Sequence, residues 1–417
     1  MYRTYVTSTQ SASTDDRAHI ETAVEQARTR RPEVDGELIT FLGALAAGDV
    51  DGAAERELAV RLQQLTSPVM AKGVEDTAFY RYHRLISLAE VGGDPGSFGS
   101  SVVDFHRATA ASAGRWPHTM LTLSTHDTKR SADVRARLNV LSELPGPWSD
   151  AVRRWADRNE RHRRDGWPDR NTEYLLYQSV VGAWPIDPDR VVAFMAKATR
   201  EAKVHTSWTD PTPEYDEAVE GFVRAILADD GFVTDLEGFL TEHRVVERGR
   251  RNSLAQTALL LTSPGVPDIY QGSELWDLSL VDPDNRRPVD YERRRRVLAA
   301  LDATPGPLAH DDDGVEKLRL VHRVLAHRRA RPETFDGAGY EPLDAPDDVV
   351  AFSRGEVATV VSCRSDRSVG GHVDGHVELP PGRWRDLVTG AQVDGGRHAT
   401  GALLERFPVA VLAREVS

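Results

Sequence analysis

A short apolar run meets seven consecutive polar residues in Thr119-Met-Leu-Thr-Leu-Ser-Thr-His-Asp-Thr-Lys-Arg130. Residues 119–124 predict a short buried strand, and a helical pattern follows from about Thr128 to Leu144. In α/β barrel enzymes the loops that follow the strands carry the chemistry, so the polar segment is a candidate active site. A simpler interpretation is that Asp127 or Thr128 only caps the helix that follows.

His126 and Asp127 are the two side chains that a barrel would place in its mouth. Lys129 and Arg130 follow directly behind them. Nearby cations favour the charged form of a carboxyl group, so Asp127 is expected to stay ionised. The spacing by itself leaves both the catalytic and the capping interpretation open.

Segments with strand and helix patterns alternate along most of the chain. A second short strand is predicted at Val266–Tyr270, and residues 68–90 predict a passage from strand to helix. Residues 2–6 have strand composition but no partner strand nearby in sequence. Alternation of this kind predicts an α/β barrel or a doubly wound sheet. Helical patterns occupy residues 15–31, 53–65, 102–111, 148–164, 172–183, 189–202, 214–227, 232–261, 291–302 and 314–330.

After about Thr334 the sequence changes to short alternating segments separated by Gly and Asp. Strands of an all-β end domain are predicted at residues 349–353, 357–363, 376–379, 384–387 and 407–412. We therefore expect five regions. They are a helical segment with an initial strand (1–67), barrel strands and helices (68–147), a helical insertion (148–260), the last barrel strand with helices (261–333) and the β domain (334–417).

The composition limits the partners that this chain can have. It has 417 residues, with 52 Lys+Arg against 65 Asp+Glu, so its formal net charge is −13. This charge repels phosphate backbones and anionic membranes, and we expect no nucleic acid and no membrane as a partner. The single cysteine, Cys363, lies in a run that predicts a buried strand. One cysteine, no membrane-spanning run and no signal-peptide pattern together predict a soluble, cytoplasmic protein.

Motifs for metals and cofactors are weak in this sequence. His372 and His376 form an HxxxH pair, but they lie in a Gly-flanked turn, which favours solvated side chains over a metal site. The sequence contains no HExxH, no phosphate-binding GxxxxGK[ST] and no GxSxG. We therefore expect no cofactor and no metal.

Three further polar clusters are candidate sites. Residues 71–82 place charged side chains among aromatic ones, as in sugar sites, where rings cover the apolar faces of a pyranose. An aromatic core edge with surface salt bridges explains that pattern equally. Residues 264–274 predict a tight turn at a strand end. The loop 282–290, which contains Asp284, is either a wall of a substrate site or only a salt-bridged loop.

Three strings resemble the maltooligosyl trehalose synthases, a branch of the α-amylase clan. They are Lys72-Gly-Val-Glu-Asp-Thr-Ala-Phe-Tyr-Arg-Tyr82, Ser124-Thr-His-Asp-Thr-Lys-Arg130 and Pro264-Gly-Val-Pro-Asp-Ile-Tyr-Gln-Gly272. The loop 282–290 resembles the same family, and the match covers almost the whole chain in the right order. The resemblance implies an incomplete (β/α)8 barrel with only the late strands, large helical insertions and a C-terminal all-β domain.

The resemblance also implies a reaction. This family converts the reducing-end α-1,4 linkage of a maltooligosaccharide into an α,α-1,1 linkage by intramolecular transglycosylation, with net retention. Asp127 matches the carboxylate that stabilises the oxocarbenium-like transition state, and His126 matches a hydroxyl-binding histidine. The other substrate-binding residues that the resemblance implies are Lys129, Arg130, Lys72, Glu75, Asp76, Phe79, Tyr80 and Asp284.

Two groups that retaining chemistry needs, a nucleophilic aspartate and an acid glutamate, are not found in this chain. In the family they lie on earlier barrel strands. We therefore expect a C-terminal portion that is inactive alone, with the N-terminal half of the same enzyme as its partner. Two alternatives stay open: another maltodextrin hydrolase or 4-α-glucanotransferase of the clan, and a non-catalytic maltodextrin-binding fragment.

Overall fold

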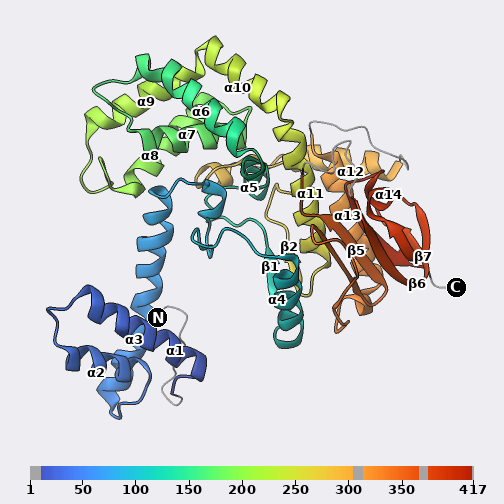
Figure 1. Cartoon of the computed structure of the whole chain (residues 1–417), viewed down its shortest axis with the longest axis horizontal. Helices are drawn as coiled ribbons and strands as arrows, with labels where there is room; N and C mark the ends of the chain where they lie inside the picture. The colour runs from blue at the N-terminus through green and yellow to red at the C-terminus, as the bar shows by residue number, and fades with distance from the viewer. Residues whose placement is uncertain (1–10, 304–312, 366–373, 416–417) are drawn as a thin grey trace. The chain divides into compact units, whose positions relative to one another are not determined.

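The computed structural model describes residues 11–303, 313–365 and 374–415 (Figure 1). These residues form two compact units. The first comprises the chain up to Arg81 together with Glu201–Lys203, and the second comprises Tyr82–Arg200 and Val204–Ser417. The strand predicted at residues 2–6 lies outside the described residues.

The first unit is helical. It contains α1 (Thr14–Arg30), α2 (Gly36–Ala46) and α3 (Ala53–Met70), followed by the π-helix η1 (Ala71–Glu75) and the 3-10 helix η2 (Ala78–Tyr80). A capping box between Ser13 and Asp16 starts α1. Ile20 packs with Ala46 and Ala47 in a small core. The strand expected near residue 68 is wrong, because α3 continues through Pro68 and then widens into η1.

The second unit holds the remaining helices. The α-helices are α4 (Val102–Arg115), α5 (Ala132–Asn139), α6 (Pro145–Asn159), α7 (Arg170–Ala183), α8 (Pro188–Ala202), α9 (Pro213–Leu227), α10 (Asp230–Glu242), α11 (Val245–Thr262), α12 (Tyr291–Ala303), α13 (Val315–Ala330) and α14 (Thr400–Leu404). Short helices are η3 (Ile86–Leu88), η4 (Val140–Glu143), η5 (Glu160–His162), η6 (Asp284–Arg286) and η7 (Pro332–Thr334). Within the described ranges, no helix combines the length and the apolarity that a bilayer span requires.

Aromatic side chains form the core of the helical part. Trp155 of α6 is fully buried and makes edge contacts with Tyr177 of α7 and with Phe232 and Phe239 of α10. The continuous helical pattern at 232–261 is split into α10 and α11, because Arg244 adopts a left-handed conformation with φ 52°. A non-glycine residue in that conformation ends one helix before the next begins.

Two short strands pair in parallel within the second unit. β1 (Met120–Thr122) lies beside β2 (Val266–Asp268), with Met120 opposite Val266 and Thr122 opposite Asp268. The predicted burial of the first strand is wrong, since Met120 is 71% exposed, Thr122 is exposed and Leu121 is only partly buried. A parallel strand is buried only where neighbours and helices cover it, and no further strand joins this sheet in the described part of the chain. Both strands direct their carboxyl ends to the same edge.

The C-terminal region forms an antiparallel sheet in the order β3-β4-β5-β8-β6-β7. Its strands are β3 (Glu341–Pro342), β4 (Val349–Arg354), β5 (Val357–Ser362), β6 (His376–Asp386), β7 (Gln392–Ala399) and β8 (Val409–Arg414). The segments predicted at 376–379 and 384–387 are one strand, β6, interrupted by a bulge between Leu379 and Arg383. β7 was not predicted, because its two glycines interrupt the alternation of apolar residues.

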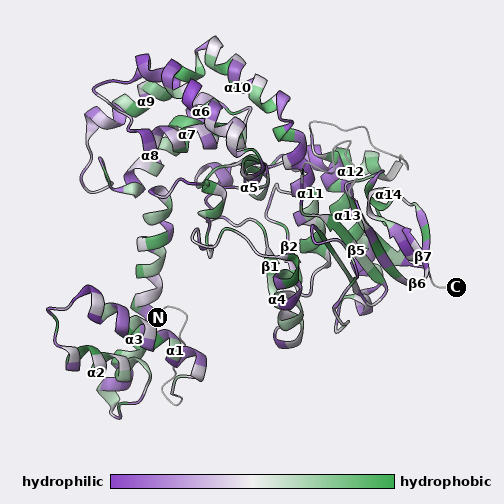
Figure 2. Ribbon diagram, in the orientation of Figure 1, coloured by the Kyte–Doolittle hydropathy of each residue, from purple (hydrophilic) through white to green (hydrophobic). Residues whose placement is uncertain are grey.

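Apolar side chains on both faces of this sheet form two cores, visible as hydrophobic colour along its inner strands in Figure 2. One face, including Phe352 and Val411, packs against Leu261 of α11 and Leu320 of α13. The other face, including Trp384, packs with Leu404 of α14. Cys363 was expected to pack inside a strand but is exposed directly after β5. The chain is therefore a mixed helix and sheet protein with an antiparallel C-terminal sheet.

Candidate active site

The polar turn 124–130 connects the carboxyl end of β1 with α5. His126 and Asp127 are exposed in this turn. The residue that caps α5 is Ser131, whose hydroxyl accepts a hydrogen bond from the N–H of Val134 at 3.3 Å. The interpretation of Asp127 or Thr128 as the helix cap is therefore wrong, and the helix begins at Ala132 rather than near residue 128.

Lys129 and Arg130 are buried behind the exposed pair. They are 3% and 1% exposed. One terminal nitrogen of Arg130 donates to the carbonyl oxygens of Ile86 at 3.2 Å and Ala89 at 3.4 Å. Arg130 thus connects the turn to η3 and to Ala89, the residue that follows it, about 40 positions earlier in the chain.

Asn285 holds the turn from the opposite side. Its side-chain nitrogen lies within hydrogen-bonding distance of the carbonyl oxygens of Thr125, His126 and Thr128, at 3.4, 3.2 and 3.4 Å. The hydroxyl of Tyr270 donates to the carbonyl oxygen of Asn285 at 3.0 Å. The segments after β1 and β2 and the loop 282–290 are therefore joined at the carboxyl ends of the two parallel strands.

Asp284 forms an ion pair within the same region. Two nitrogens of Arg190 each lie 2.8 Å from its carboxylate oxygens, and the N–H of Leu280 donates to it at 2.8 Å. Burial by itself would raise the pKa of Asp284, but these hydrogen bonds and the charges of Arg190 and Arg287 hold that pKa below its ordinary value. Asp284 is therefore an ionised anchor that fixes the loop 282–290.

The first unit brings the residues of the Lys72 string together. Lys72 and Asp76 form an ion pair with 2.5 Å between Nζ and Oδ2. The hydroxyl of Thr77 donates to the carbonyl oxygen of Lys72 at 2.7 Å. Phe79 and Tyr80 are each 3% exposed, whereas the side chain of Lys72 is 78% exposed. This segment forms the π-helix η1, an irregularity that occurs often at functional sites. Glu75, in the same π-helix, is half-buried.

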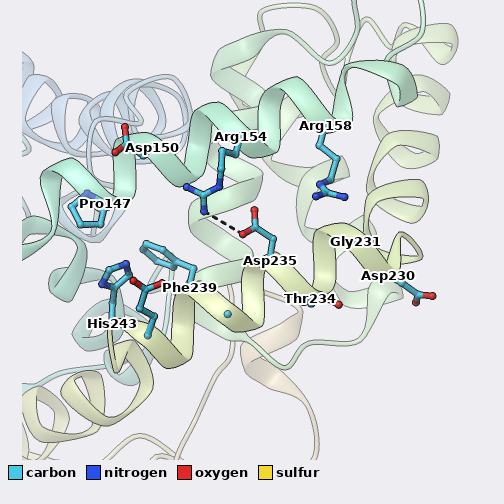
Figure 3. Close-up of a pocket in the computed structure, with 12 residues that line it drawn as sticks. Pro147, Asp150, Arg154, Arg158, Asp230, Gly231, Thr234, Asp235, Phe239 and His243 are labelled. Carbon is cyan, nitrogen blue, oxygen red and sulfur yellow. Dashed lines mark hydrogen bonds and ion pairs between the residues drawn. The ribbon is translucent and has the colours of Figure 1, made fainter.

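A separate groove of about 920 Å³ lies between α6 and α10 (Figure 3). Arg154 and Asp235 face each other from the two helices and form an ion pair at 3.2 Å. Asp235 also accepts a hydrogen bond from the indole N–H of Trp155 at 2.9 Å. No residue singled out in the sequence lines this groove. Its charged pair is accounted for by the packing of the two helices.

Residues that contact the candidate turn were missed in the sequence, among them Glu90, Arg135, Asn285 and Arg286. Glu90 lies near the buried Ile86 and Ala89, and a carboxylate among apolar residues was the signal that could have drawn attention to it. Asn285 lies next to Asp284 in a loop rich in polar residues, where nothing in the sequence distinguishes it. Both contact the turn across long sequence separations.

Comparison with known proteins gives a consistent result. No family model matches the chain. It is 39% identical over 408 residues to a protein of Mycobacterium tuberculosis (strain H37Rv) named maltooligosyl trehalose synthase, covering 94% of this chain and 49% of that protein. The protein of the same name from strain CDC 1551 gives the same values.

Solved structures agree with this relation. The maltooligosyltrehalose synthase of Arthrobacter ramosus superposes with a TM-score of 0.85 at 37% identity, covering 96% of this chain and 51% of that chain. A hypothetical maltooligosyl trehalose synthase of Sulfolobus tokodaii superposes with a TM-score of 0.74 at 28% identity. The match covers 99% of this chain and 52% of that chain. The chain spans about half the length of the curated relatives that it matches. It is thus a relative of the maltooligosyl trehalose synthases and corresponds to their C-terminal part.

Proposed function

We propose that this chain contributes the transition-state-stabilising carboxylate, Asp127, to a maltooligosyl trehalose synthase. The reaction is the intramolecular conversion of the reducing-end α-1,4 linkage of a maltooligosaccharide into an α,α-1,1 linkage. The observation that supports it best is an exposed Asp127 on a turn held from two sides at the carboxyl end of a parallel strand. Polar groups fixed before reaction stabilise developing charge without reorganisation, which suits this role.

The remaining site residues would recognise the sugar. His126 is exposed beside Asp127 and would bind a hydroxyl group. We assign Lys129, Arg130 and Asp284 to the support of the turn that presents Asp127, since Lys129 and Arg130 are buried within it and Asp284 is paired with Arg190. We assign Lys72, Glu75, Asp76, Phe79 and Tyr80 of the first unit to the binding of the released glucose. A closed pocket favours recapture of that glucose because it excludes water and raises the effective concentration.

We also propose that β1 and β2 are late strands of a (β/α)8 barrel completed by a second polypeptide segment. Met120, Val266 and Trp116 after α4 are large apolar side chains with exposures of 71%, 46% and 68%. A two-stranded parallel sheet with exposed apolar faces is marginal in water, which supports a covering partner. The relatives are about twice as long as the matched region, so their N-terminal half is the partner that we propose. That half would supply the nucleophile and the general acid.

Reconstitution tests this proposal. The pure chain is incubated with maltopentaose, alone and after mixing with the N-terminal half of the Arthrobacter ramosus protein, and reducing ends are measured. We expect no turnover by the chain alone and loss of reducing ends in the mixture, abolished by Asp127→Asn. A rise in reducing ends would identify a hydrolase, and constant reducing ends with new chain lengths would identify a glucanotransferase. Turnover by the chain alone would contradict the assignment of the missing groups to the partner.

A further inference from the structure

Glu90 makes an unusual set of contacts beneath the turn 124–130. Its Oε1 accepts a hydrogen bond from the backbone N–H of Lys129 at 2.7 Å, and its Oε2 lies 3.1 Å from the backbone nitrogen of Arg130. Oε1 also accepts from the N–H of Val91 at 2.8 Å. One carboxylate therefore binds two successive amides of the turn that presents His126 and Asp127.

Arg135 completes this arrangement. Its Nη1 lies 2.9 Å from Oε2 of Glu90 and 2.9 Å from the carbonyl oxygen of Arg130, and its Nη2 donates to the carbonyl oxygen of Leu123. The guanidinium thus binds carbonyls on both sides of the turn, Leu123 before it and Arg130 at its end. The side chains of Glu90 and Arg135 are 13% and 15% exposed, so water competes little for these hydrogen bonds.

The geometry separates the two faces of the turn. The amides of Lys129 and Arg130 point to Glu90, while the carbonyl of His126 points to Asn285. With its backbone groups engaged on these sides, the turn leaves the side chains of His126 and Asp127 exposed. Charge-assisted hydrogen bonds of this kind are shorter and stronger than neutral ones and hold a loop in one conformation.

We propose that Glu90, together with Arg135, is a positioning residue that sets the conformation in which the turn presents His126 and Asp127 to a sugar. Glu90 acts through the backbone and does not itself touch the substrate. The effect on sugar binding rests on the proposed function of Asp127, whereas the effect on the turn does not. The two parts of the proposal can therefore be measured separately.

The variant Glu90→Gln tests the proposal, because it keeps the size of the side chain and removes one acceptor and the charge. Asp386→Asn is the matched control, since Asp386 is a buried carboxylate that accepts from the backbone amides of Val388 and Thr389 in the β domain. Hydrogen exchange of a peptide covering residues 124–131 is followed by mass spectrometry. Binding of maltopentaose is measured by calorimetry, below the melting temperatures of all the proteins.

We expect exchange of residues 124–131 in Glu90→Gln to rise about tenfold, since the amides lose charge-assisted hydrogen bonds, while Asp386→Asn leaves it unchanged. Affinity for maltopentaose falls about fivefold or more in Glu90→Gln alone, because the mobile turn must be ordered on binding. In a double-mutant cycle, adding Arg135→Gln to Glu90→Gln raises the exchange of residues 124–131 only a little further, as expected for residues that act together.

Unchanged exchange of this peptide in a folded Glu90→Gln protein overturns the proposal. So does an equal loss of affinity in Asp386→Asn, which would show a general effect of stability. If the unmodified chain does not bind maltopentaose, the binding measurement is repeated on the reconstituted mixture with the N-terminal half. Absence of binding there contradicts the proposed function, and the exchange measurement still decides whether Glu90 positions the turn.

Discussion

The side-chain nitrogen of Asn285 lies 3.2 Å from the carbonyl oxygen of His126, although the two residues are 159 positions apart in the chain. Asn285 is buried at 7% exposure, whereas His126 is exposed. A guanidinium nitrogen of Arg286 lies 3.2 Å from the same carbonyl oxygen. The loop 282–290 therefore supports the backbone of the candidate turn and leaves the imidazole accessible.

Replacing Asn285 by Ala is expected to lower the free energy of unfolding by about 1–3 kcal/mol, because buried carbonyl oxygens lose their donor. Asn285→Asp is expected to lower the free energy of unfolding further, since it places a carboxylate against the same carbonyl oxygens. Urea denaturation measures both variants. Asn139→Ala, at an exposed position, is the control and should stay within about 0.5 kcal/mol of the unmodified chain.

Substitutions of Asp127 and of Ser131 are predicted to have different effects on the free energy of unfolding. Asp127→Ala should change the unfolding free energy by less than about 0.5 kcal/mol, because the side chain is exposed and does not cap α5. Ser131→Ala should cost about 1 kcal/mol or more, since it removes the helix cap. Its hydroxyl also donates to the carbonyl oxygen of Asp277 at 2.5 Å. A large destabilisation by Asp127→Ala, measured by denaturation, would show that Asp127 has a structural role.

The ion pair between Lys317 and Asp133 is buried, with both side chains 4% exposed and 2.9 Å between Nζ and Oδ1. Lys317→Met should therefore destabilise the chain by about 3–5 kcal/mol, because Asp133 stays buried without its counter-charge. The double variant Lys317→Met with Asp133→Leu is expected to recover part of this loss. Glu57→Gln breaks an exposed pair with Arg61 and should cost no more than about 0.5 kcal/mol. Thermal and urea denaturation check all three.

The stability of the fold in acid is expected to depend on Asp284. Burial would raise its pKa, but the hydrogen bonds from Arg190 and Leu280 keep it below the ordinary value. A carboxyl group with a lowered folded pKa stabilises the fold above its unfolded pKa of about 3.9 and loses this contribution as the pH falls through the folded pKa. Arg190→Gln should therefore lower stability at pH 7 and flatten the fall in stability below about pH 4. Denaturation from pH 2 to 7 tests this, and an unchanged slope would contradict it.

The pKa of Asp277 is shifted in the opposite direction from that of Asp284, so its effect on stability has the opposite pH dependence. Burial raises its pKa, and the nearby charge of Asp133 adds to the effect, against opposing contributions from Ser279 and Lys317. Its contribution is fully present below an unfolded pKa of about 3.9 and is lost as the pH rises through the higher folded pKa. Asp277→Asn should therefore gain stability relative to the unmodified chain as the pH rises from about 4 to 7. A relative loss over that range would show that the pKa of Asp277 is lower in the folded state than in the unfolded state, and would contradict this prediction.

Much of the local structure could be predicted from the sequence. The helices α1, α3, α6, α7, α8, α9, α12 and α13 and the strands β4, β5 and β8 lie where periodicity placed them. Their apolar spacing and caps are local properties of the chain. The polar run that carries His126 and Asp127 was also apparent, because charged residues directly after an apolar strand are a local pattern.

Other features depended on residues distant in sequence. Nothing near Arg244 predicted the break between α10 and α11, and the exposure of Met120 depends on which elements cover β1. The groups that hold the turn, Glu90 and Asn285, come from segments about 40 residues before it and 160 residues after it. Periodicity reports only which face of an element is apolar, and it cannot say which backbone amide a distant carboxylate will bind.

The sequence by itself determined many of the helical and strand segments, the relation to the maltooligosyl trehalose synthases and the polar turn at residues 124–130. Only the tertiary structure decided that Asp127 is exposed instead of capping α5, and that Glu90, Arg135 and Asn285 hold the turn. The physical reason is that helix and strand formation follow from neighbouring residues. Buried polar groups take their hydrogen-bond partners from whichever segments packing brings within about 3 Å.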